Sequence, residues 1–150
     1  VHYLANAPEH YAALRENPAK ARTALDEAMR LETPIQTVCR LTTEDVDLGE
    51  GMVVPADNKI IVLLGAANRD PAAWENPDAF DLGRHTMGHV ALGHGVHMCI
   101  GQMIARMEGE LMLQALAARV KTITPMGPTR QRLNNNLRSF ASVPVALASA

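Results

Sequence analysis

The sequence predicts a mainly helical chain with small β-sheets, an α+β fold, and three observations support this. Apolar residues recur at helical spacing near the start of the chain and again from about Ile100 to Val120. Between these regions, short runs rich in Val, Ile and Thr are separated by glycine-containing turns. The segment 68–101 has no regular period and many turn residues. With 150 residues, 47% of them hydrophobic, the chain is large enough for one domain with its own core.

Two helices are expected in the first part of the chain. The first runs over 8–16, with a proline at its first position, where the missing N–H costs nothing. The second covers 19–32, with Asn17 as its N-cap, and it ends at Thr33 because the residue before a proline disfavours the α conformation. Its predicted buried stripe is Ala21, Leu25, Ala28 or Met29, and Leu31.

The middle and the end of the chain favour strands. The run 36–41 is rich in Val and Thr, and 46–48 and 52–55 flank a glycine turn as a small hairpin. The apolar run 59–64 is typical of a buried strand. Short apolar stretches after residue 122 predict further small strands. The long coil over 68–101 is of the kind that carries function in compact domains.

Composition excludes several classes of protein. A net charge of −2 excludes a strongly basic nucleic-acid binder. The longest apolar run, Ile60–Ala67, is far shorter than the about 20 residues that span a bilayer, and the start of the sequence shows no signal-peptide pattern. The only two cysteines, Cys39 and Cys99, are too few for a secreted disulfide scaffold or a C-x-x-C-H haem attachment. We therefore expect a cytoplasmic protein with no nucleic-acid partner and no membrane association.

The coil ends in a glycine-rich segment that delivers Cys99 to the start of the last long helix. The N-terminus of a helix presents free N–H groups and partial positive charge, which favour the thiolate form of a cysteine. Gly93, Gly95 and Gly101 allow a flat, bulky ligand to approach the backbone closely. A lone thiolate of this kind is a suitable axial ligand for haem iron.

Two other interpretations of this segment stay open. Cys99 is a plain buried side chain in the first, since free cysteine is among the most buried residue types. The second is a metal site, because one cysteine and several histidines fall within fifteen residues. The candidate ligands are His85, His89, His94, His97 and Cys99. Structural zinc sites usually pair their ligands more closely, as in C-x-x-C.

A charged cluster is the other feature that could organise the coil. Glu27 and Arg30 lie three residues apart, so they share one face of the predicted helix and can pair. Arg84 lies upstream of the cysteine segment. A buried glutamate held between these two arginines would be a geometrically demanding, satisfied cluster.

Four motifs taken in series resemble the cytochrome P450 family, in order and spacing, from about Leu4 to the end of the sequence. They are Glu27-x-x-Arg30, Asn68-Arg69-Asp70-Pro71, Pro77-x-x-Phe80-Asp81-x-x-Arg84, and Gly93-His94-Gly95-Val96-His97-Met98-Cys99-Ile100-Gly101. The resemblance implies the C-terminal, haem-binding part of the P450 fold over 1–150. That part holds the J and K helices, β hairpins, the meander, the cysteine loop, the L helix and the C-terminal strands. The N-terminal part and most of the distal I helix are then absent.

The resemblance assigns roles to individual residues. Cys99 would be the proximal thiolate ligand of haem iron, and so both the metal ligand and the catalytic residue. Glu27, Arg30 and Arg84 would form the structural triad that locks the K helix to the meander. The remaining haem-binding positions would be Arg40, Leu92, Gly93, His97, Gly101 and Ala105.

Finer roles follow within these sets. Arg40 and His97 match propionate-pairing positions, and Ile35 and Val38 fall in the segment that lines the substrate side. Leu92 departs from the family pattern, which usually has Phe there, packed near the thiolate. We expect this difference to affect haem packing or redox potential.

The implied activity is that of a soluble, bacterial-type haem-thiolate monooxygenase using haem b (iron protoporphyrin IX). It would hydroxylate or dealkylate a small organic substrate with O2, taking electrons from a ferredoxin-type donor at the proximal face. The segments 34–37 and 134–138 are similar to enzymes that oxidise para-substituted benzoic acids. Because the distal half is not represented, we expect no complete turnover from these residues alone. The alternatives are a non-catalytic haem-thiolate sensor module and a structural zinc domain built on the histidines.

Overall fold

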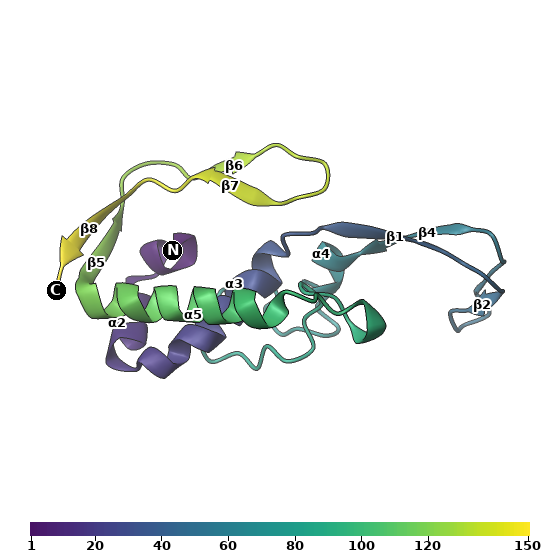
Figure 1. Ribbon diagram of the computed structural model, residues 1–150, viewed down its shortest axis with the longest axis horizontal. Coiled ribbons are helices and arrows are strands. Elements are labelled where there is room, and N and C mark those ends of the chain that lie inside the picture. The colour runs from purple at the N-terminus through teal and green to yellow at the C-terminus, as the bar shows by residue number, and fades with distance from the viewer.

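The computed structural model describes residues 1–150 and confirms a mainly helical fold with small β-sheets (Figure 1). The α-helices are α1 (His2–Asn6), α2 (Pro8–Glu16), α3 (Ala21–Glu32), α4 (Leu64–Ala67) and α5 (Gln102–Arg119). Two 3-10 helices, η1 (Pro18–Lys20) and η2 (Gly95–His97), precede α3 and α5. The helix over 8–16 and the irregular coil over 68–101 are as predicted. The five-residue α1 was not predicted, because it is too short to show a period.

The strands form four separate two-stranded antiparallel sheets. The pairs are β1 (Thr37–Leu41) with β4 (Lys59–Leu63), β2 (Val46–Asp47) with β3 (Val53–Val54), β5 (Val120–Pro125) with β8 (Val145–Ser149), and β6 (Arg130–Arg132) with β7 (Ser139–Ser142). In Figure 1 the β1–β4 ribbon and its β2 tip extend away from the helices at one end of the molecule, while β5 and β8 lie at the other.

The core lies where α1, α2, α3 and β5 pack against α5. Its buried members are Leu4, Ala5, Tyr11, Leu14, Ala21, Ala24, Leu82, Leu113, Ala117 and Ile123. Leu82 belongs to the coil, so the coil is packed into the core although it has no regular structure. None of the helices is both long and apolar enough to cross a membrane.

The predicted buried stripe of the second helix is partly wrong. Asn17 caps the chain as expected, accepting the Ala19 N–H at 3.2 Å, but a 3-10 turn follows and α3 begins at Ala21. The fully buried side chains of α3 include Glu27 and Arg30, whereas Leu25 is only half-buried. This face of α3 packs against the coil, whose backbone groups need polar partners.

Two apolar runs are also more exposed than their sequence pattern predicted. The run 59–64 forms β4 as a strand but is largely exposed, with Ile61 60% accessible, because no third layer covers the β1–β4 ribbon. On α5 most of the predicted apolar stripe faces outward. Only Leu113 and Ala117 are buried, and Leu116 is partly buried against the core. The exposed members of that stripe are Met103, Ile104, Met107 and Leu111.

Candidate functional site

Cys99 stands at the end of a closed loop that begins at Leu92. The Cys99 N–H donates to the Leu92 carbonyl at 2.8 Å, and the Cys99 carbonyl accepts the Gln102 N–H at 3.2 Å. The first bond closes the loop, and the second joins it to the first turn of α5. The Cys99 side chain is free and exposed. The interpretation of Cys99 as a plain buried residue is therefore wrong.

Gly93 is the tightest point of this loop. Its φ is +80°, a region that residues with a Cβ rarely adopt. A Cβ added there would lie 2.4 Å from the His97 carbonyl oxygen. Glycine is thus required at this position by both backbone conformation and space. The close passage of 93 against 97 is what turns the chain back toward Cys99.

A pocket of about 480 Å³ lies beside the loop, with nine hydrophobic residues among the fourteen that line it. It brings together residues from three places: the start of β1, the strand β4 with α4, and the cysteine loop. The sequence-predicted site residues in its lining are Ile35, Val38, Arg40, Leu92, Gly93, His97 and Cys99. Residues separated by more than fifty positions therefore share one cavity with the thiol.

Arg40 is the cation of this pocket. Its Nη1 donates to the neighbouring Cys39 carbonyl at 2.8 Å, and it forms no ion pair within the chain. His97 and His94 also line the pocket, and neither side chain is engaged in a hydrogen bond. The pocket thus combines apolar walls, one thiol, and a guanidinium with donors to spare for an anionic group.

Two of the predicted cofactor residues lie outside the pocket lining. Gly101 precedes α5, and a Cβ built on it would lie 3.9 Å from the Cys99 sulfur. Ala105 is on the exposed side of the first turns of α5. Ile35, which lines the pocket, pairs with Leu137 through an isolated antiparallel bridge. That bridge brings the β6–β7 hairpin against the segment expected to face a substrate.

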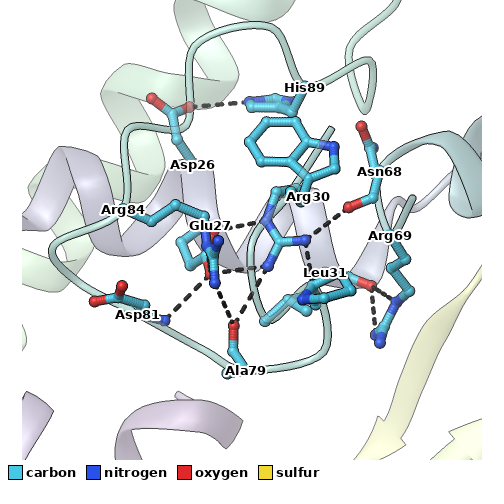
Figure 2. Close-up of polar contacts among 12 residues, drawn as sticks. Asp26, Glu27, Arg30, Leu31, Asn68, Arg69, Ala79, Asp81, Arg84 and His89 are labelled. Atoms are coloured by element: carbon cyan, nitrogen blue, oxygen red, sulfur yellow. Dashed lines mark hydrogen bonds and ion pairs between the residues drawn. The ribbon is translucent and has the colours of Figure 1, made fainter. Parts of the chain in front are cut away.

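Glu27, Arg30 and Arg84 meet in one buried cluster (Figure 2). Arg30 donates from Nε to Glu27 Oε2 at 2.8 Å and from Nη2 to Oε1 at 2.9 Å. Arg84 donates from Nε to the same Oε1 at 2.9 Å, and the Asp81 N–H adds a bond at 3.2 Å. One carboxylate therefore joins α3 to the coil at residues 81 and 84.

The two arginines also satisfy carbonyl groups of the coil. Arg30 Nη1 donates to the Asn68 and Pro77 carbonyls at 2.6 and 2.8 Å, and its guanidinium lies 5.1 Å from the Trp74 ring centroid. Arg84 donates to the Glu75 carbonyl at 2.5 Å and the Asn76 carbonyl at 3.1 Å. Side chains thus replace the regular backbone pairing that the coil lacks.

Asn68 forms a further link, between the end of α3 and the segment that leads to Cys99, which the sequence did not predict. Asn68 is 1% exposed, and its side chain bonds Thr33 on one side and the Val90 N–H on the other. Asn68 stood in a quoted motif, but nothing in the motif shows that its side chain reaches two segments so far away in sequence.

Asp26 forms a third, partly buried cluster. Its carboxylate pairs with Arg22 and with Arg106 of α5, each at 3.0 Å, and His89 Nε2 lies 3.7 Å away (Figure 2). Burial by itself raises the pKa of Asp26, but the nearby imidazole of His89 and the hydrogen bonds from Arg106 and Arg22 outweigh it and hold the pKa well below its usual value. Asp26 therefore stays ionised and joins α3 to α5.

A second pocket, of about 520 Å³, lies on the other side of the cysteine loop. Leu92 and Gly93 line both pockets, so the loop is a thin wall between them. The charged and titratable residues of this second pocket are Arg22, Asp26, Arg84, His85, His89 and Arg106. It is more polar than the pocket that contains Cys99, and its surplus charge is positive.

The zinc interpretation fails on geometry. No group of three or more His, Cys, Asp or Glu side chains lies close enough together to hold a metal ion. His85 and His89 line the second pocket, whereas His94, His97 and Cys99 line the first. The loop that separates the two pockets thus divides the five candidate ligands.

Comparison with curated proteins gives relatives that match most or all of the chain. It is 48% identical over 150 residues to "Cytochrome p450 CYP199A2" of Rhodopseudomonas palustris, covering 100% of this chain and 36% of that protein. It is 39% identical over 120 residues to "Biotin biosynthesis cytochrome P450" of Bacillus subtilis, covering 80% of this chain and 30% of that protein. The chain thus spans about a third of the length of these relatives.

Solved structures show the same relationship in three dimensions. A crystal structure of P450BioI in complex with an acyl carrier protein superposes with a TM-score of 0.89 at 36% identity, covering 97% of this chain and 38% of that one. CYP108D1 from Novosphingobium aromaticivorans gives a TM-score of 0.94 at 30% identity, covering 99% and 36%. The fold, not only the motifs, is therefore that of the corresponding region of these proteins.

Residues 21–145 match the family model "Cytochrome P450". This range includes the Glu27–Arg30–Arg84 cluster, the coil, and the loop that carries Cys99. Members of this family are haem proteins, and the glycine-rich motif that ends in Cys99 lines the apolar pocket. The chain belongs to the cytochrome P450 family.

Proposed function

We propose that residues 1–150 form the proximal, haem-binding portion of a haem-thiolate monooxygenase, with Cys99 as the axial ligand of iron in haem b. The observation that carries this proposal is the placement of the free Cys99 thiol in an apolar pocket that also contains Arg40 and His97. Seven residues proposed for cofactor or substrate contact from the sequence line that one pocket.

The pocket has the donor set that this cofactor requires. Haem is a flat, largely apolar ring with an iron centre and two carboxylate arms. The apolar walls suit the ring, the thiol suits the iron, and Arg40, which pairs with no acid in the chain, suits a propionate. His97 is a second candidate for a propionate contact.

When bound, haem with a thiolate ligand supplies the activation of O2 for insertion of oxygen into an organic substrate. The chain's own residues hold and orient the ligand. The Leu92 carbonyl fixes the Cys99 backbone, and Gly93 allows the loop to pass close to the His97 carbonyl and turn back toward Cys99. Leu92, in the wall between the two pockets, sets the packing behind the thiolate.

For the substrate we propose a small organic molecule, an aromatic acid of the para-substituted benzoate type, that is hydroxylated or dealkylated. The resemblance of segments 34–37 and 134–138 supports this class. The structure places the two segments together through the Ile35–Leu137 bridge and the Arg138 N–H to Pro34 carbonyl bond of 2.8 Å. Because the chain spans 36% of CYP199A2, we propose that turnover needs further residues of the P450 fold.

As electron donor we propose a ferredoxin-type protein that docks over the second pocket, in the cytoplasm. Arg22 and Arg106 make that face positive, and the cysteine loop alone separates it from Cys99. An acidic donor would be attracted to such a face, and its binding would weaken with added salt. Both cysteines are free, as expected in a reducing compartment.

The proposal is tested by the reduced, CO-bound difference spectrum of the chain after reconstitution with haem. We expect the strongly red-shifted Soret band of thiolate-ligated haem in the unaltered chain and its loss in Cys99→Ala. The matched control is Cys39→Ala, because Cys39 is the other free, exposed cysteine and lies outside the pocket lining. This control should keep the band.

Each other outcome has a clear meaning. Retention of the band in Cys99→Ala would exclude Cys99 as the ligand. Haem and CO binding without acceptance of electrons from any ferredoxin would favour the sensor module. Stoichiometric zinc binding in place of haem would overturn the thiolate assignment altogether.

A further inference from the structure

Asn68 is fixed at three points, although it is neither part of the ion-pair cluster nor part of the pocket lining. Its carbonyl accepts from Arg30 Nη1 at 2.6 Å. Its Nδ2 donates to Thr33 Oγ1 at 2.8 Å, and its Oδ1 accepts the Val90 N–H at 2.8 Å. The residue is 1% exposed, so water cannot replace any of these partners.

Thr33 is a rigid partner for this side chain. It ends α3 in a left-handed conformation, with a φ of +38°, and is fully buried. Its hydroxyl donates to the Arg30 carbonyl at 2.7 Å, which leaves the oxygen free to accept from Asn68. The orientation of the Asn68 amide is therefore set by the last turn of α3.

Val90, the other partner, begins the segment that ends at Cys99. Its carbonyl accepts the Gly93 N–H at 3.0 Å, and two residues further on the Leu92 carbonyl accepts the Cys99 N–H at 2.8 Å. Val90, Ala91 and Leu92 all line the pocket that contains Cys99. These two backbone hydrogen bonds connect Val90 to Cys99, so the position of the Val90 amide constrains the position of Cys99.

The bonds of Asn68 are not those of an ordinary helix cap. Asn68 follows α4, yet its side chain bonds no group of α4 and instead reaches partners 35 residues before it and 22 residues after it. An amide is suited to this bridge because it donates at one end and accepts at the other. Neither a carboxylate nor an apolar side chain does both.

We infer that Asn68 is a positioning residue for the cysteine loop. It holds the Val90 amide, and through it the Cys99 ligand, at a fixed position relative to the last turn of α3. Asn68 touches neither the thiol nor the pocket. The Glu27 cluster joins α3 to residues 81–84, whereas Asn68 joins α3 to the loop itself. The inference rests on the proposed function only where haem is used as a probe.

The test begins with the chain in the absence of haem, by hydrogen exchange of the Val90 amide. In Asn68→Leu, which keeps volume but removes both bonds, we expect this amide to exchange about tenfold faster or more. The Ala105 amide, bonded to the Gly101 carbonyl at 3.0 Å, should be unchanged. Asn58→Ala is the matched control, because the side chain of Asn58 bonds only within its own exposed turn.

A second variant tests whether the hydrogen bond to Val90, rather than the Asn68 side chain as a whole, protects the Val90 amide. Asn68→Asp keeps an acceptor for the Val90 N–H, so protection of that amide should return to within about threefold of the unaltered chain, a difference below 1 kcal/mol. If Asn68→Leu fails to fold, Asn68→Asp alone decides. Protection of the Val90 amide retained there supports the inference, and protection of Val90 lost while that of the Ala105 amide is kept overturns it.

Haem gives an independent readout. In the reconstituted Asn68→Leu chain, the share of CO complex with the red-shifted thiolate band should fall while total bound haem is unchanged. The inference would be overturned if two quantities both stay within twofold of their values in the unaltered chain. These are the exchange rate of the Val90 amide and the fraction of CO complex with the thiolate band. If the unaltered chain binds no haem, the proposed function fails, and hydrogen exchange still decides the role of Asn68.

Discussion

Glu27 and Arg30 form a two-bond ion pair within α3, with distances of 2.8 and 2.9 Å and both side chains 0% exposed. Arg84 shares the Glu27 carboxylate and has a side chain that is 10% exposed. Because none of these groups has good access to water, each charge depends on the others. Removal of one partner leaves an uncompensated buried charge, which typically costs about 3–5 kcal/mol.

The first prediction is that Glu27→Gln loses about 3–5 kcal/mol of unfolding free energy, measured by urea denaturation followed by circular dichroism. Arg22→Gln is the control. Arg22 pairs with Asp26 at 3.0 Å on the same helix, but its side chain is 50% exposed, so its loss should cost no more than about 1 kcal/mol. Equal losses in the two variants would contradict the prediction.

The residues themselves indicated the Glu27–Arg30 pair and the loop at Cys99, and the family resemblance placed Arg84 in the same cluster. Glu27 and Arg30 share a helix face through their spacing alone, and Gly93 and Gly95 mark the turn before the cysteine. The convergence of Arg40 with Cys99 depends on the pairing of β1 with β4, and the family resemblance supplied it. Asn68 could not be predicted as a bridge, because its partners are set by the path of an irregular coil.

Burial was the property that periodicity predicted least well. An apolar run such as 59–63 is typical of a covered strand, but whether a layer covers it depends on the rest of the fold. Met103 and Met107 on α5 likewise follow a helical period while facing outward. Conversely, Glu27 and Arg30 are buried because their charges cancel, which a hydrophobic pattern cannot show.

The second prediction concerns acid stability and Asp26. The pKa of this carboxyl is depressed in the folded chain, so its contribution to stability is present above the unfolded pKa, about 3.9, and is lost as the pH falls through the lower folded value. Asp26→Asn should therefore be less stable than the unaltered chain at pH 7, and the difference should shrink below about pH 4.

Urea denaturation at several pH values between 3 and 7 measures this difference. Asp57→Asn is the matched control, since Asp57 lies in an exposed turn and forms no ion pair. If the difference in unfolding free energy between Asp26→Asn and the unaltered chain stays constant from pH 7 to pH 3, the arginines do not depress the pKa of Asp26.

The third prediction concerns the crossing of α3 and α5 at Gly109. A Cβ added there would lie 2.6 Å from Leu25 Cδ2 and 3.3 Å from Leu25 Cγ, which is too close for the present packing. Gly109→Ala gains about 1 kcal/mol of helix propensity but must displace Leu25, so we expect a net loss of about 1–2 kcal/mol.

A double-mutant cycle identifies Leu25 as the cause. In a Leu25→Ala background the clash is absent, so Gly109→Ala should become neutral or stabilising by up to about 1 kcal/mol. Thermal or urea unfolding of the four chains gives the coupling. If Gly109→Ala costs the same in both backgrounds, helix packing against Leu25 is not what requires the glycine.

Tyr3 and Glu32 link α1 to the end of α3. The Tyr3 hydroxyl donates to Glu32 Oε1, while Glu32 Oε2 accepts from Arg138 Nε at 2.8 Å. The Tyr3 ring also stacks on Phe80, with centroids 4.8 Å apart. Burial, followed by the hydrogen bond and charge of Glu32, raises the pKa of Tyr3 well above its usual value.

The fourth prediction follows from the sign of this shift. A raised pKa means that neutral Tyr3 stabilises the fold fully below its unfolded pKa of about 10, and that this contribution is lost as the pH rises through the higher folded value. Tyr3→Phe keeps the stacking but loses the bond, so it should be less stable at pH 8, with a difference that narrows above about pH 10.

The chain has two tyrosines, and burial also raises the pKa of Tyr11, so little tyrosinate absorbance should appear at pH 10 while the chain is folded. Suppose instead that substantial tyrosinate absorbance appears at pH 10 while the circular dichroism is native, and that this absorbance is lower in Tyr3→Phe. Glu32 would then not raise the pKa of Tyr3.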